Sequence, residues 1–323
     1  QQERDEKGQV RFRDTSDTLG VKYGNNLNPQ ASMGAAVGDY NRDGLLDLFV
    51  TNFSHDYNNV YLGNRSAGRG TYFFKDRGLQ LMGQAVFYDL SWGCGWIDFD
   101  NDRDLDLYFG NGHVYKEIDL YAKTGSSYEQ INSLFECMDA ENEGYREIGT
   151  KAQQNLSPQS SVDPKSLFAG DGLTVAKCTR GVAFADWNND GRMELMTTNM
   201  NDGCTLLVNT TEASASRNWL KIQLAQPGAN REALGASVLV EAGGVKQRFV
   251  NLRQTSFLGG CDPRLHVGLG DAKTCTITIT WPGAERDTTV YENVPAGKLW
   301  QLDRKSGKAT DVGLKAFEVD LGD

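Results

Sequence analysis

Short apolar runs that alternate with acidic turns dominate the first two thirds of this chain. The runs at residues 32–38, 91–97 and 179–185 each end at an acidic turn, and a second apolar run follows each turn. In the first copy, Leu48 and Val50 alternate with Phe49, so both faces of the predicted strand are apolar. Strands that are apolar on both faces are typical of sheets covered on both sides. The pattern therefore predicts β-hairpins packed in layers.

The acidic turns share one spacing, with oxygen-bearing side chains at positions 1, 3, 5 and 9. These residues are Asp39, Asn41, Asp43 and Asp47 in the first turn, Asp98, Asp100, Asp102 and Asp106 in the second, and Asp186, Asn188, Asp190 and Glu194 in the third. Position 6 is Gly in the first and third turns and Arg103 in the second. An Asn stands thirteen residues after the first Asp of each turn, at Asn52, Asn111 and Asn199.

This spacing predicts about three calcium sites. Calcium binds six to eight oxygens at about 2.3–2.6 Å, and alternate residues of a tight loop can turn their carboxylates inward. The residues at position 7, Leu45, Asp104 and Arg192, would add a backbone carbonyl, and Asp104 also adds an acid. The turns differ from EF-hand loops, because position 12 lacks the bidentate Glu and a strand follows in place of a helix. A polar hairpin without metal is the alternative for one copy, but three identical spacings favour calcium.

Each repeat continues into further strands, and about four strands per repeat is the size of a propeller blade. The first two turns are 59 residues apart and the next two are 88 apart. The difference predicts an insertion at about residues 113–177, with an acidic and partly helical piece at residues 128–147. Such an insertion is either a functional loop or a decorated surface loop. At residues 30–210 the repeats resemble the FG-GAP/VCBS family of calcium-binding propeller repeats.

After residue 216 the pattern changes to alternating strands separated by turns that contain Gly or Pro. The run Asn218-Trp-Leu, Gly235-Ala-Ser-Val, Leu265-His-Val-Gly-Leu-Gly270 and Trp281-Pro-Gly283 resembles the ASPIC/UnbV domain over residues 217–303. Cys261 departs from the pattern of that family. The resemblance implies a C-terminal domain that follows VCBS-type repeats in secreted proteins.

The predicted fold class is all-β, with propeller-like blades that carry calcium loops, followed by a sandwich-like C-terminal domain. The predicted segments are a flexible N-terminus at residues 1–9, repeats at 10–215, the ASPIC/UnbV domain at 216–305 and a tail at 306–323. Residues 10–21 are expected at the outer part of a sheet. Three blades are fewer than the about four to eight of closed propellers. The C-terminal domain, a degenerate fourth blade or a neighbouring subunit could cover the open side.

The composition restricts the partners and the cellular location that we expect for the protein. The net charge of −10 argues against nucleic acid as a partner and suits divalent cations. No apolar run approaches the length of a membrane span. The chain begins Gln-Gln-Glu, which we interpret as a mature secreted form, although an expression boundary would look the same.

The cysteines also favour an extracellular protein. They are six in number and lack the CxxC spacing of zinc or redox sites. We expect Cys261 to pair with Cys275 across the turn between them. A weaker prediction pairs Cys178 with Cys204, and elimination leaves Cys94 and Cys137.

No nucleophile elbow, P-loop or zinc-protease motif is present, and His266 is better explained by packing than by catalysis. His113, just beyond Asn111, is a weak candidate for a ligand or a base. We predict a non-enzymatic, secreted, calcium-binding structural or adhesion protein with protein or glycan partners, and one hypothesis is that it assembles as a homo-oligomer or filament. One alternative is a carbohydrate-active enzyme or biosynthetic accessory protein with its site in residues 113–177. Another is a ligand-binding receptor module.

Overall fold

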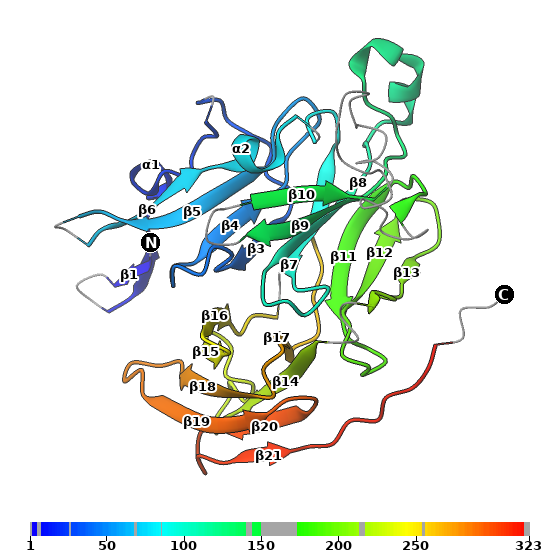
Figure 1. The fold of residues 1–323 in the computed structure, drawn as a ribbon. Helices are drawn as coiled ribbons and strands as arrows, with labels where there is room; N and C mark the ends of the chain where they lie inside the picture. Colours follow the sequence, from blue (N-terminus) through cyan, green and yellow to red (C-terminus); the bar gives the residue numbers. More distant parts are fainter. Residues whose placement is uncertain are drawn as a thin grey trace.

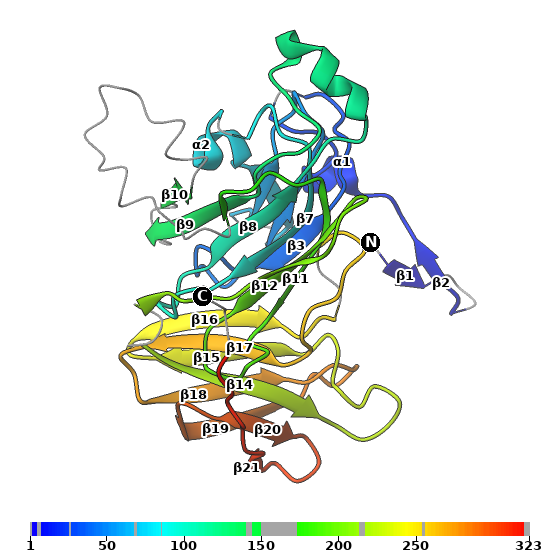
Figure 2. The same cartoon turned by 90° about the vertical axis from the view of Figure 1, so that its right-hand side faces the viewer.

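The computed structural model describes residues 2–4, 8–25, 27–67, 70–84, 86–139, 144–149, 173–212, 217–253 and 256–319. Over these residues the chain is nearly all β, which confirms the predicted fold class. Three sheets built from the repeats lie side by side, and a two-sheet sandwich lies against one end of them (Figure 1). The view in Figure 2 shows the same two layers after a quarter turn.

Each repeat forms one antiparallel meander in which consecutive strands pair. The first sheet contains β3 (Ala35–Gly38), β4 (Asp47–Val50), β5 (Asn59–Arg65) and β6 (Tyr72–Asp76). The second contains β7 (Ser91–Ile97), β8 (Asp106–Asn111), β9 (Ser133–Asp139) and β10 (Gly144–Ile148). The third contains β11 (Thr179–Ala185), β12 (Glu194–Asn199) and β13 (Thr205–Leu207). This arrangement agrees with propeller-like blades.

The second sheet is the middle layer, because β7 contacts both β3 and β11. Phe49 and Phe109 pack between the first and second sheets, with ring centroids 5.4 Å apart. On the other face of the second sheet, Tyr108 meets Phe184 edge to face at 6.2 Å. Gly95 permits this close approach, since a Cβ there would lie 2.2 Å from the ring of Phe184. Both faces of the middle sheet are therefore buried, as the apolar pattern predicts.

The C-terminal domain is a sandwich of two four-stranded sheets. One sheet has the order β17 (Leu265–Gly270), β14 (Asn218–Ala225), β20 (Leu299–Asp303) and β21 (Ala309–Asp311). The other has the order β16 (Val245–Val250), β15 (Ser237–Ala242), β18 (Thr274–Thr280) and β19 (Thr288–Pro295). The core between them is apolar and includes the buried Trp281. β21 lies within the predicted tail.

The remaining elements are short. At the N-terminus, β1 (Gln2–Arg4) pairs with β2 (Val10–Phe12) in a separate ribbon. This ribbon was not predicted, because residues 1–9 were expected to be flexible and the segment from residue 10 was expected to join a larger sheet. The helices are α1 (Ser16–Leu19), α2 (Gly78–Met82), η1 (Lys116–Leu120) and η2 (Ala122–Thr124).

The expected insertion is only partly an insertion. Its segment at residues 128–147 was predicted to be partly helical, and this prediction is wrong, since β9 and most of β10 come from it and complete the second sheet. Acidic residues gave the helical appearance, but Phe135 and Cys137 alternate with Glu136 and are buried as in a strand. Residues 150–172 of the predicted insertion lie outside the described residues.

The segment between β16 and β17 joins the sandwich to the innermost strands of all three sheets. Ser256 forms a β-bridge with Ala35 of β3, and its hydroxyl oxygen accepts the N–H of Cys94 in β7 at 2.9 Å. Asp262 donates its N–H to the carbonyl of Phe184 in β11 at 3.3 Å. A cavity of about 160 Å³ lies between the sheets and the sandwich. Through this segment the C-terminal domain contacts all three repeat sheets.

Candidate metal centres in the acidic turns

The three acidic turns have one backbone conformation. Positions 4 and 6 are left-handed in every turn, with φ between 59° and 61° at position 4 and between 83° and 89° at position 6. The N–H at position 6 then donates to the carboxylate at position 1. This hydrogen bond joins Gly44 to Asp39 at 3.0 Å, Arg103 to Asp98 at 2.9 Å and Gly191 to Asp186 at 3.1 Å. The repeated spacing in the sequence therefore corresponds to a repeated conformation.

The carboxylate at position 9 ties each turn to its own sheet. It accepts the N–H of position 2 at 3.1–3.2 Å, from Tyr40, Phe99 and Trp187 respectively. In the first two sheets its other oxygen accepts an N–H of the third strand, so Asp47 binds Gly63 at 2.9 Å and Asp106 binds Cys137 at 2.8 Å. These bonds fix the position-9 carboxylate at the inner end of the turn.

Several carboxylate oxygens in the turns are buried without a hydrogen-bond partner. In the first turn this atom is Oδ1 of Asp39, and in the third the atoms are Oδ1 of Asp186 and Oε1 of Glu194. In the second turn, one oxygen from each of Asp98, Asp100 and Asp106 lies within 4.8 Å of the other two. Buried charged oxygens without a donor are costly, and a bound cation satisfies them. The residues present therefore fit a hard divalent cation.

The pKa values show that burial, with a smaller contribution from neighbouring acids, disfavours the charged form of these carboxylates when no cation is bound. Burial, followed by the charge of Asp43, raises the pKa of Asp39 to about 6. Burial raises the pKa of Asp47 to about 7 and that of Glu194 to about 7, and neighbouring acids add to both. Burial and the other acids of the second turn hold the pKa values of Asp98 and Asp106 well above the usual range.

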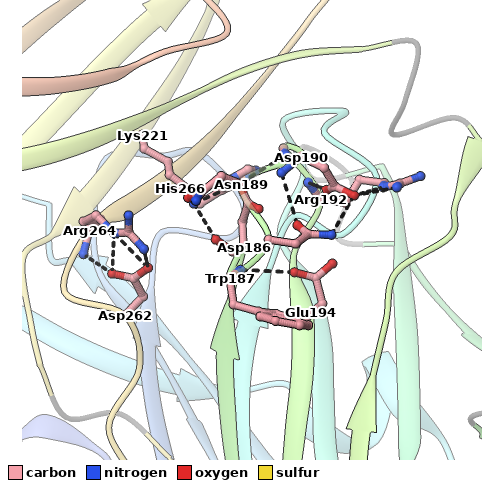
Figure 3. Close-up of polar contacts among 12 residues, drawn as sticks. Asp186, Trp187, Asn189, Asp190, Arg192, Glu194, Lys221, Asp262, Arg264 and His266 are labelled. Carbon is pink, nitrogen blue, oxygen red and sulfur yellow. Dashed lines mark hydrogen bonds and ion pairs between the residues drawn. The ribbon is translucent and has the colours of Figure 1, made fainter. Parts of the chain in front are cut away.

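Positions 3, 5 and 7 complete the predicted ligand set. The side-chain oxygen at position 3 accepts the N–H of position 5 at 3.1–3.3 Å in each turn, and the carboxylate at position 5 accepts the N–H of position 7 at 2.7–2.9 Å. The side chains at position 7 bind other residues. Asp104 pairs with Arg42 of the first turn, and Arg192 pairs with Asp190 (Figure 3). At position 7 this leaves the backbone carbonyl as the candidate ligand, which is how Leu45, Asp104 and Arg192 were predicted to contribute.

Each sheet also contains an Asn thirteen residues after the first Asp of its turn, and this Asn holds the opposite end of the sheet together. The side-chain amide of Asn52 donates to the carbonyl of Tyr57 and to Oδ1 of Asn59, both at 2.7 Å. Asn111 donates to the carbonyl of Ile131 at 2.8 Å and to the Ser133 hydroxyl at 3.1 Å. Asn199 makes the same kind of pair with Gly203 and Thr205. These asparagines connect the second strand to the third, so they are structural parts of the repeat.

Cationic side chains of the C-terminal domain reach the second and third turns, and the sequence did not predict these contacts. Arg217 pairs with Asp100 at 2.7 Å. The buried Lys221 pairs with Asp186 at 2.9 Å and also donates to Oδ1 of Asn189 at 2.9 Å (Figure 3). Both residues lie more than twenty positions from any turn in the sequence, so no local spacing could have identified them.

The structure contains none of the three expected disulfides, since none of the six cysteines forms a disulfide bond. Cys261 lies in the segment along the innermost strands and packs against the core between the second and third sheets, whereas Cys275 lies in the sandwich core. Their closeness in the sequence therefore did not place them together. Cys178 is buried and Cys204 is exposed, and Cys94 and Cys137 are both buried.

The other candidate residues lie away from the turns. Nδ1 of His113 accepts the N–H of Tyr115 at 3.1 Å, and its ring packs edge to face on Phe53. Burial lowers the pKa of His113. Tyr88, Tyr115 and Tyr121 are exposed. In the described part of the chain, no helix is long and apolar enough to cross a membrane.

Comparison with known proteins identifies two recognised segments in this chain. The sequence profile of the FG-GAP-like repeat matches residues 39–109, which include the first two acidic turns, and that of ASPIC and UnbV matches residues 226–309. These matches confirm the two resemblances inferred from the sequence.

Curated relatives named cartilage acidic protein 1 resemble most of the chain. The protein from Homo sapiens is 24% identical over 275 residues, which cover 84% of this chain and 35% of the relative. The protein from Mus musculus is 25% identical over 281 residues, with 85% and 37% covered. The protein from Xenopus tropicalis is 24% identical over 324 residues, with 98% and 43% covered. This chain therefore spans about two fifths of the length of the relatives it matches.

Proposed function

We propose that this chain is part of a secreted, calcium-binding structural or adhesion protein of the extracellular matrix type. The observation that carries the proposal is the repetition of one turn conformation, in which buried carboxylate oxygens lack donors in the first and third turns and cluster in the second. The name of the relatives, cartilage acidic protein 1, supports a matrix setting.

The residues at positions 1, 3, 5 and 9, with the carbonyl at position 7, would hold one calcium ion in each turn. A bound calcium ion neutralises carboxylates that would otherwise repel one another. The backbone of the turns positions the acids for this role. In the first and third turns a backbone N–H binds Oδ2 of the Asp at position 1, which leaves its buried Oδ1 for the cation. Binding to the folded state alone would stabilise the protein by mass action.

Substitution of one ligand tests this proposal. Asp43→Ala and Asp190→Ala should each remove one calcium ion in a calorimetric titration and lower the melting temperature in calcium, with little effect in chelator. The matched control is Asp311→Ala, which removes an exposed acid paired with Lys298 on the sandwich and should change neither measurement appreciably. Equal losses in calcium and in chelator would show that these acids are structural without binding metal.

The proposal includes assembly through the face of the third sheet that the described residues leave exposed. Met196 lies between Ala183 and Leu206 in register, and Met196 and Leu206 are 46% and 47% exposed. In the first two repeats the corresponding inner faces pack against another sheet. A second copy of the chain could cover this face, which would give a homo-oligomer or filament.

Light scattering in calcium tests assembly separately from calcium binding. Assemblies in calcium that dissociate for Met196→Glu with Leu206→Glu would support the contact, and Val290→Glu, at an exposed position on the sandwich, is the matched control. A monomer at every concentration in calcium would remove the assembly part of the proposal and leave an adhesive role. The exposed Tyr115 and Tyr121 would then be the first candidates for a glycan contact.

A further inference from the structure

The second and third acidic turns are joined through Asn101, a residue outside the predicted ligand set. Asn101 occupies position 4 of the second turn, is fully buried and has a φ of 61°. Its side-chain amide donates to the carbonyl of Gly191 in the third turn at 2.8 Å. Its Oδ1 accepts a hydrogen bond from Nε2 of His266 on β17 at 2.8 Å. One side chain therefore contacts two turns and the sandwich.

The direction of the hydrogen bond to His266 follows from the chemistry of both groups. The amide nitrogen of Asn101 donates to Gly191, so the amide oxygen is the acceptor that faces the ring. Burial lowers the pKa of His266 to about 3, so the ring is neutral, and because its Nε2 faces an acceptor oxygen the proton lies on Nε2. Trp219 stacks on this ring, with centroids 5.8 Å apart, and holds its orientation.

The backbone of the sandwich also fits closely against both turns. Gly270 donates its N–H to the carbonyl of Asn101 at 3.0 Å. A Cβ at Gly268 would lie 2.0 Å from Oδ2 of Asp98, a predicted ligand. A Cβ at Gly191 would lie 1.8 Å from Nε1 of Trp219. The sandwich therefore contacts position 1 and position 4 of the second turn and position 6 of the third turn. The backbone conformation at these positions determines where the carboxylates of the turns point.

The first turn is connected differently. Its position 4 is Arg42, whose guanidinium pairs with Asp104 of the second turn. The nearest sandwich side chain to its position 6 is Arg248, which would lie 4.0 Å from a Cβ at Gly44. At position 6 the first turn therefore has looser contact with the sandwich than the third turn, where Trp219 covers Gly191, and the second turn, where Arg103 lies against Gly270.

We propose that Asn101 is a positioning residue that couples cation binding in the second and third turns to each other and to docking of the C-terminal sandwich. This inference rests on the proposed calcium function. A cation that orders one turn fixes Asn101 or Gly191, and the hydrogen bond between them then orders the other turn. Mutation of a residue that orients metal ligands without binding the metal commonly weakens metal affinity by about 10–100-fold. Coupling between two binding sites is reciprocal, so each site would strengthen the other.

The test uses the full chain with Asp43→Ala, which leaves the second and third turns as the two remaining sites. Calorimetric titration with calcium should show cooperative binding of two ions. Adding Asn101→Gly should weaken the affinity at least about tenfold and abolish the cooperativity. Glycine is chosen because it adopts the left-handed conformation without strain, so its effect reports the lost side-chain bonds. Small-angle scattering in calcium should show a slightly larger radius of gyration for this variant, because the sandwich loses one of its contacts with the turns.

Matched variants separate the inference from general instability. Asn293→Gly changes an exposed, left-handed Asn of the sandwich with φ of 54° and should leave binding unchanged. Asn101→Ala should behave like Asn101→Gly; weak binding with Ala but normal cooperative binding with Gly would mean that only the backbone conformation matters and would overturn the proposal. Cooperative binding that persists in both Asn101 variants would also overturn it. Absence of calcium binding by the unaltered chain would instead remove the proposed function, and the coupling with it.

Discussion

The repeat sheets and the C-terminal sandwich are both β structures, but they are stabilised in different ways. The sandwich encloses a continuous apolar core in which Val238, Ile277 and Leu302 are fully buried. The repeat sheets also have apolar cores, yet each carries a group of buried acids at the end that faces the sandwich. Burial of apolar surface needs no ligand, whereas burial of several like charges does. The stability of the repeats should therefore depend strongly on calcium and pH, and that of the sandwich should depend on them only weakly, through its contacts with the turns.

The largest expected effect is in the sandwich core. Trp281→Ala removes a buried ring and its hydrogen bond to the Thr289 hydroxyl, and it should cost about 3–5 kcal/mol of unfolding free energy. Denaturant unfolding should give the same loss in calcium and in chelator. A loss that depends on calcium would mean that the sandwich core is not independent of the turns.

A smaller effect is expected at the opposite end of the repeats. Asn111→Ala removes a buried amide that connects β8 to the third strand of its sheet, and buried partners that lose a hydrogen bond cost about 1–3 kcal/mol. The loss should appear in the unfolding of the repeats, followed by tryptophan fluorescence and circular dichroism. The exposed Asn293 provides the control, since Asn293→Ala should change stability by much less. Equal losses would contradict the connecting role.

The smallest expected effect is a difference between the repeats and the sandwich in how their stability depends on pH. The folded pKa values of Asp47 and Glu194 are raised to about 7, above the values of about 4 that these groups have when unfolded. The folded repeats therefore bind more protons than the unfolded chain between about pH 4 and 7, and without calcium their stability should fall as the pH rises through this range. Melting in chelator from pH 4.5 to 7.5 measures this.

Calcium should remove or reverse this pH dependence, because bound carboxylates must be ionised. The sandwich transition should shift little in either solution. If the melting temperature of the repeats in chelator rises with pH, the buried acids are instead ionised and paired with cationic groups of the chain.

Much of this architecture could be predicted from local patterns. The spacing of Asp39, Asp43 and Asp47 identified the turns, and the change of pattern after residue 216 identified the second domain. The strands β9 and β10 were missed because acidic residues such as the half-buried Glu136 and Glu147 made the segment look helical. The role of Asn101 could not be predicted, since its partners Gly191 and His266 lie 90 and 165 residues away and only the folded chain brings them together.

The cysteines show the same limit. Closeness in the sequence suggested that Cys261 pairs with Cys275, but the two residues belong to different cores. A turn pattern reports the conformation of a few consecutive residues, whereas a disulfide depends on the complete path of the chain. The sequence therefore predicts the acidic turns better than it predicts what lies against them.

Differential scanning calorimetry of the full chain, in calcium and then in chelator, tests the central claim most directly. The account predicts two transitions in calcium, of which the one from the repeats moves to a markedly lower temperature in chelator, while the one from the sandwich, which is linked to the turns only through its docking contacts, moves much less. A calcium titration that saturates at about three ions per chain should accompany the shift. Identical scans in the two solutions would contradict the account, because the acidic turns would then hold their buried carboxylates without a cation.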